Sequence, residues 1–169
     1  MTPAASIARR IMSRSEKAIQ VTAGNDRFSK PFIFDDGYFQ CKVSAKDTGG
    51  ELCIYETIKK RKGGPFLHYH HSQDEWFFVR QGQFLFQVGD DKFQLGAGDS
   101  IFPPRKVPHS FANISDEGIL IIIYQPAGTM EQFFLDGSRL LSTNPSPHEW
   151  QTLCQLHGVV NVGPRLTID

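Results

Sequence analysis

The chain has very little cysteine for its length. Three cysteines, Cys41, Cys53 and Cys154, occur among 169 residues, an odd number with no CxxC spacing. Secreted domains that depend on disulfides carry closely spaced cysteines in even number, so no disulfide framework is expected here. We interpret all three as small buried side chains, which fits a reducing cytoplasm.

Long apolar runs and an excess of one charge are also missing. No run reaches the roughly 20 apolar residues that span a bilayer, and residues 1–18 are basic without the apolar stretch of a secretion signal. Lys plus Arg and Asp plus Glu balance at 18 each. Nothing therefore favours binding to nucleic acid or to an anionic membrane, and a cytoplasmic protein is expected.

What the sequence does contain points to β structure. It has fourteen phenylalanines, and aromatic residues fit pleated, half-buried surfaces. Between residues 32 and 124, short strand-like runs are separated by Gly, Pro and Asp turns at about every 8–12 residues, with no helical period between them. We predict an all-β sandwich or barrel over residues 31–126, preceded by an N-terminal arm over residues 1–30.

The period of the apolar residues changes after residue 126. The segments Thr129–Gln132 and Ser146–Glu149 both have the pattern of a capping box, and apolar residues at helical spacing follow each of them. Pro147 occupies a favoured first helical position, and Gly158 is placed to end the second helix. We predict two short helices in a C-terminal extension, residues 127–169, packed on the barrel or on the partner of a dimer.

A cluster of histidines marks the candidate site. Positions i and i+2 of a strand face the same side, so His68 and His70 would present two imidazoles together. Glu75 follows five positions after His70, which is the wrong parity for one continuous strand. Placing all three on one face therefore requires the chain to bend between His71 and Asp74.

A further histidine follows a proline-rich segment over residues 103–108 and starts the alternating run His109, Phe111 and Asn113. Imidazole and carboxylate groups together suit Fe, Mn, Ni, Zn, Cu or Co, and four such ligands leave a coordination position for a substrate. We predict one divalent transition metal, held by His68, His70, Glu75 and His109.

A histidine pair alone is a weak indication, but the wider pattern resembles the cupin family. The first cupin motif runs His-x-His, three or four residues, Glu, six residues and Gly. This chain has His68 and His70, four residues, Glu75, six residues and Gly82.

The second cupin motif runs Gly, five residues, Pro-x-Gly, two residues, His, three residues and Asn. This chain has Gly98, Pro104, His109 and Asn113 at that spacing. Lys106 stands where the motif has its second Gly, which concerns the conformation of the turn and not a metal ligand.

The resemblance covers about residues 47–139 and is to single-domain bacterial cupins often described as quercetinase-like. It implies a jelly-roll barrel (a double-stranded β-helix), and a homodimer paired through N-terminal strands such as residues 32–43. It also implies that Glu75 can act as a catalytic base. The favoured function is a metal-dependent dioxygenase acting on a small enolisable or aromatic substrate. The predicted substrate pocket consists of Phe66, Phe77, Phe86, Phe102, Phe111 and Ile121.

Two other functions stay open at this point, because a fold does not determine a reaction. One is a non-oxidative isomerase or lyase, for which Tyr55 or Tyr124 could supply an acid or base. The other is a non-catalytic cupin that binds a small ligand. Asp74 is interpreted as a solvated turn residue, with orientation of a ligand imidazole as the alternative. Arg105 is interpreted as a solvent-facing loop residue, with attraction of a carboxylate or enolate at the mouth of the barrel as the alternative.

Overall fold

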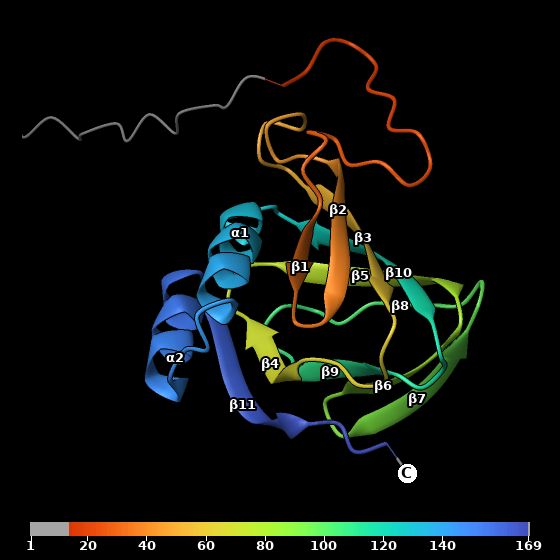
Figure 1. The fold of residues 1–169 in the computed structure, drawn as a ribbon, viewed down its shortest axis with the longest axis vertical. Coiled ribbons are helices and arrows are strands. Elements are labelled where there is room, and N and C mark those ends of the chain that lie inside the picture. Colours follow the sequence, from red (N-terminus) through yellow and green to blue (C-terminus); the bar gives the residue numbers. More distant parts are fainter. Residues whose placement is uncertain (1–13, 169) are drawn as a thin grey trace, which may run out of the picture.

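Two antiparallel sheets face each other and form a cupin jelly roll, as predicted (Figure 1). The computed structural model describes residues 14–168. One sheet has six strands in the order β1-β2-β3-β10-β5-β8, and the other has five in the order β11-β4-β9-β6-β7. The six strands are β1 (Phe32–Phe34), β2 (Gly37–Val43), β3 (Cys53–Lys59), β5 (Asp74–Gln81), β8 (Ser100–Ile101) and β10 (Gly118–Gln125). The other five are β4 (Phe66–His70), β6 (Gln83–Val88), β7 (Asp91–Gly96), β9 (His109–Asn113) and β11 (Val159–Arg165).

Alternation of buried and partly exposed side chains sets which face of each strand points inward. In β5, Glu75, Phe77 and Val79 are buried, whereas Trp76 and Phe78 between them face outward. The rings of Phe77, Phe84, Phe86 and Phe111 meet between the sheets at centroid distances of 5.2–6.3 Å. Interdigitating aromatic side chains of this kind make up much of the core between the two sheets.

Helices α1 (Met130–Leu141) and α2 (Pro147–Leu156) cover one end of the sandwich beside β1 (Figure 1). Phe34 of β1 connects them to the barrel, because its ring lies 5.5 Å from Phe133 and 6.0 Å from Trp150. Neither helix is both long and apolar enough to cross a membrane.

The two predicted capping boxes have different outcomes. At α2 the prediction is confirmed, since Ser146 and Glu149 each accept a hydrogen bond from the other's backbone N–H. At α1 it is wrong, because Thr129 makes no side-chain cap hydrogen bond. Its hydroxyl lies 2.9 Å from Nδ1 of His157 instead, at the end of α2. A tertiary contact has therefore replaced the local one.

The last strand, β11, was not predicted, because the sequence indicated only helices in the C-terminal extension. It pairs antiparallel with β4, placing Val159 opposite His70 and Asn161 opposite His68. The C-terminal extension therefore contributes a strand to the five-stranded sheet in addition to its helices. Of the predicted N-terminal arm, residues 1–13 lie outside the described part of the chain.

Candidate metal centre and its cavity

The predicted ligand residues come together at one place between the sheets. His68 and His70 lie on the inward face of β4, Glu75 is the second residue of β5, and His109 opens β9. One ligand atom from each lies within 4.8 Å of the others. The break between β4 and β5, at residues 71–73, supplies the bend that brings Glu75 to the histidines.

Backbone hydrogen bonds orient two of the three imidazoles. Nδ1 of His68 donates to the carbonyl of Phe66 at 2.7 Å, and Nδ1 of His109 donates to the carbonyl of Val107 at 2.9 Å. A carbonyl can only accept, so the proton of each neutral ring is fixed on Nδ1. The lone pair of Nε2 then points to the centre of the group, as metal ligation requires.

His70 provides the test of whether these residues fit a cation. Its ring is buried, and neither nitrogen has a hydrogen-bond partner among residues 14–168, although Nε2 lies 3.1 Å from Oε2 of Glu75. Glu75 is only 2% exposed. Burying a carboxylate and an unsatisfied imidazole is costly unless a cation compensates them. The donor set fits a divalent transition metal.

Electrostatics favour an ionised carboxylate at Glu75. Burial raises the pKa of Glu75, but His70 and His109 outweigh it and hold that pKa well below its usual range. Burial, with the neighbouring His109 and His70, lowers the pKa of His68 to about 3. Burial also lowers the pKa of His109, yet contact with Glu75 raises it overall.

Tyr124 completes the wall beside the carboxylate. It is the cross-strand partner of Glu75, and its ring lies 5.6 Å from that of His70. Burial and the nearby Glu75 raise its pKa well above the ordinary value, so the hydroxyl keeps its proton. Tyr55, the other tyrosine considered, lies instead in an aromatic cluster with Phe39 and Phe134.

An ion pair near the surface holds the loop that precedes His109. Asp74 forms a two-pronged ion pair with Arg105, with N···O distances of 3.0 and 2.5 Å. Asp74 therefore pairs with Arg105 and not with a ligand imidazole. Arg105 is an exposed loop residue, as predicted, whose guanidinium is held by Asp74. Lys106 has a φ of +67°, which explains why the cupin motif has glycine at this position.

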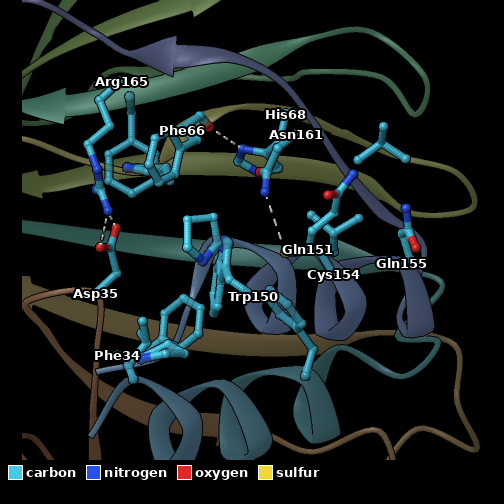
Figure 2. Close-up of a pocket in the computed structure, with 18 of the residues that line it drawn as sticks. Phe34, Asp35, Phe66, His68, Trp150, Gln151, Cys154, Gln155, Asn161 and Arg165 are labelled. Atoms are coloured by element: carbon cyan, nitrogen blue, oxygen red, sulfur yellow. Dashed lines mark hydrogen bonds and ion pairs between the residues drawn. The ribbon is translucent and has the colours of Figure 1, made fainter. Parts of the chain in front are cut away.

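A cavity of about 610 Å³ adjoins this group. His68, Glu75 and Tyr124 line it. Figure 2 shows His68 together with Trp150 of α2 and Asn161 of β11, which also line the cavity. Its walls are largely apolar, with Phe39, Ile122 and Trp150 among them. The size and the apolar lining suit a small organic molecule.

Three of the six residues predicted for a substrate pocket line this cavity, and three lie elsewhere. Phe66, Phe77 and Phe111 line the cavity. Phe86 does not, because its ring is packed within the core and only 1% exposed. Phe102 does not either, since it follows β8 on the outside and is 55% exposed. Ile121 faces outward on β10, and its neighbour Ile122 takes the inward position.

Several other residues that line the cavity were not predicted from the sequence. Trp150, Gln151 and Cys154 come from α2, and Asn161 comes from β11 (Figure 2). Lys59 and Arg165 bring positive charge to the same cavity. The helical spacing of Trp150 and Cys154 did indicate one packed face, but no spacing in the sequence indicates that this face closes the cavity.

Comparison with known proteins agrees with this architecture. Residues 54–124 match the family model described as the cupin domain. An uncharacterized protein of Methanocaldococcus jannaschii is 27% identical over 95 residues, which cover 55% of this chain and 76% of that protein. An uncharacterized protein of Streptomyces coelicolor is 32% identical over 56 residues, covering 33% of this chain and 53%, or about half, of that protein.

Among solved structures, the polyketide cyclase RemF of Streptomyces resistomycificus superposes with a TM-score of 0.50 at 18% identity. The match covers 57% of this chain and 72% of RemF. At that identity the likeness shows a shared fold.

Proposed function

We propose that this chain, whose residues 54–124 form a cupin domain, is a metal-dependent dioxygenase acting on a small enolisable or aromatic substrate. The observation that carries the proposal is that a metal-binding type of residue group faces a largely apolar cavity of about 610 Å³. His68, His70, Glu75 and His109 would hold one divalent transition metal, one of Fe, Mn, Ni, Zn, Cu or Co. Such an ion supplies Lewis acidity and, when redox-active, the electron transfer that O₂ chemistry needs.

The residues of the chain have distinct tasks in this proposal. Phe77, Phe111 and Ile122 exclude water and hold the flat apolar part of the substrate. Glu75 is the catalytic residue. A carboxylate has two oxygens, so one can remain among the histidines while the other takes the proton from an enol hydroxyl.

The experiment is to load metal-free protein separately with Fe, Mn, Ni and Co and to measure O₂ uptake with flavonols and β-diketones. We expect uptake with at least one metal, and its loss in Glu75→Gln. Replacement of the exposed His148 by Ala is the matched control and should leave uptake unchanged. A protein that binds each metal stoichiometrically and takes up no O₂ with any substrate would contradict the dioxygenase assignment.

A second candidate is a non-oxidative isomerase or lyase, and Tyr124 favours it. A buried hydroxyl against Glu75 gives the site a proton donor beside a proton acceptor. Turnover under anaerobic conditions, abolished by Tyr124→Phe, would establish this alternative. Ligand binding without turnover under either atmosphere would leave a non-catalytic binding protein.

We also propose that the chain forms a homodimer in the cytoplasm. Strand β1 is an edge strand of its sheet, and its Ile33 is 63% exposed. Exposed edges of this kind favour pairing with a second chain. The three buried thiols are unpaired, which suits a reducing compartment. Light scattering should give twice the chain mass of 19.1 kDa, and a monomer at micromolar concentration would count against the dimer.

A further inference from the structure

We call His68, His70, Glu75 and His109 the histidine group. The cavity beside it is also lined by a buried lysine. Lys59 is the last residue of β3 and is only 4% exposed, because Tyr55, Thr57 and Lys59 all project from the inward face of that strand. Its ammonium group donates one hydrogen bond, to the backbone carbonyl of Asp35. It forms no ion pair with any carboxylate of residues 14–168. An ammonium has three donors, and a buried charge without a counterion is costly.

The acidic residues near Lys59 already have partners. The carboxylate of Asp35 receives both prongs of the Arg165 guanidinium, at 2.9 and 2.8 Å (Figure 2). Asp36, on the surface beside it, lies 3.8 Å from Arg61. Arg165 and Arg61 therefore neutralise the two carboxylates. The positive charge of Lys59 is left without a carboxylate of its own among the described residues. We call Lys59, Asp35 and Arg165 the cationic rim.

The backbone around Lys59 is held in place from two sides. Asp35 and Asp36 form the two-residue turn between β1 and β2, with φ angles of +45° and +61°. Non-glycine residues take such angles where surrounding contacts fix them, and here the turn directs the Asp35 carbonyl at Lys59. On the other side, the amide of Asn113 donates to the carbonyls of Lys59 and Arg61 at 3.4 and 3.1 Å.

The surface outside the rim is also basic. Lys59 begins the run Lys59-Lys60-Arg61-Lys62, and the last three of these residues are exposed. The whole chain carries no net charge, so this run is a local concentration of positive charge. A basic cluster beside a cavity of low dielectric raises the local concentration of anions.

The rim lies within reach of the histidine group. The guanidinium of Arg165 stacks over the ring of Phe66 at 4.5 Å. Phe66 and His68 project from the same face of β4, two positions apart, which corresponds to about 7 Å along a strand. A small molecule can therefore contact both the rim and the histidine group.

We propose that the cationic rim binds the carboxylate of a substrate whose apolar body lies against the aromatic walls and extends to His68 and Glu75. This inference rests on the proposed function and narrows its substrate class to amphipathic organic acids. Lys59 is the residue that binds the carboxylate. Arg165 is a positioning residue, because it neutralises Asp35 and fixes the turn whose carbonyl holds Lys59.

The test uses the full chain after removal of metal by a chelator, so that it does not depend on metal binding or turnover. The probes are 3-phenylpropionate and its uncharged amide, titrated by calorimetry and by the fluorescence of Trp150, which lines the cavity. We expect the acid to bind about tenfold more tightly than the amide, as for a hydrogen-bonded ion pair shielded from water. Lys59→Met should abolish this preference, and the matched variant of the exposed neighbour, Lys60→Met, should keep it.

Arg165→Gln should reduce the preference without abolishing it, and Lys59→Arg should retain most of it, which separates loss of charge from loss of fold. Equal affinity of the native chain for acid and amide, or no binding of either at millimolar concentration, would overturn the proposal without any variant. Full preference in a folded Lys59→Met protein would overturn it as well. An acid preference in a chain that never takes up O₂ would leave the rim standing and reject the dioxygenase.

Discussion

The histidine group and the cationic rim face the same cavity but are built in different ways. Three of the four residues of the histidine group lie between positions 68 and 75, at the junction of β4 and β5. The rim unites Asp35, Lys59 and Arg165, and its ion pair joins residues 130 positions apart. The histidine group depends mainly on a short stretch of chain, whereas the rim exists only because β1, β3 and β11 meet in the folded barrel.

The largest effect is expected for Phe34→Ala. This variant tests whether the cavity wall near the cationic rim can be destabilised while the histidine group still binds metal. Phe34 packs against Phe39, Phe133, Phe134 and Trp150 at 5.1–6.0 Å. We expect Phe34→Ala to lower the free energy of unfolding by about 3–5 kcal/mol, because it leaves a cavity between β1 and the helices.

Chemical denaturation measures this loss, and elemental analysis of the folded variant should still find metal. Phe102→Ala is the matched control, since that ring is 55% exposed, and it should change stability by no more than about 0.5 kcal/mol. A folded Phe34→Ala protein that no longer binds metal would show that the two regions are not independent.

The variant with the next largest expected effect, His70→Ala, changes the histidine group alone. We expect His70→Ala to weaken metal binding at least about 100-fold, the upper range for loss of a residue that merely supports a ligand. The metal-free fold should survive, because the ring nitrogens of His70 have no hydrogen-bond partner within residues 14–168.

Competition with a chromophoric chelator measures the affinity, and His148→Ala serves as a surface control. If His70→Ala binds metal as tightly as the native chain, His70 is not a ligand. Together with Phe34→Ala, this variant compares the two regions in both directions. Phe34→Ala should lose stability and keep metal, whereas His70→Ala should stay folded and lose metal.

The smallest effect concerns the loop before His109. Lys106 has left-handed backbone angles, which are unfavourable for a side chain with a Cβ. We expect Lys106→Gly to raise the free energy of unfolding by about 1 kcal/mol or less, with unchanged metal affinity.

Thermal or chemical denaturation detects the change, and Lys92→Gly gives a control of opposite sign. Lys92 lies in strand β7 with an exposed side chain, where glycine should cost about 0.5–1 kcal/mol. A destabilised Lys106→Gly protein would mean that the lysine side chain stabilises the loop through contacts that outweigh its backbone conformation.

Local patterns predicted the parts of the molecule that local interactions determine. The alternation of His68 and His70, the wrong parity of Glu75 and the box at Ser146 all correspond to features of the structure. Asn113 ends the second cupin motif, and its amide donates hydrogen bonds to three backbone carbonyls, those of Lys59, Arg61 and Ser115.

The unpredicted features depend on contacts between remote segments. Thr129 has the pattern of a cap, but His157 lies close enough to occupy its hydroxyl. Ile121 and Ile122 are chemically equivalent, and the register shift between Ile119 and Leu120 helps to decide which one faces the cavity. In the sequence Lys59 resembles any residue of a basic surface run, but in the fold it lies between strands β2 and β10, with its ammonium at the Asp35 turn. No spacing rule carries such information.

The position of β4 has a consequence for the kinetics of folding. This strand makes one residue pair with β9, His68 with His109, and its remaining pairs are with β11, about 90 positions further along the chain. Closing a loop of that size costs entropy before any contact compensates for it, so sheets with distant partners form slowly. We therefore expect β4 to dock late, after the hairpin of β6 and β7. Metal added to the unfolded chain should then accelerate refolding little, and its stabilising effect should appear mainly as slower unfolding.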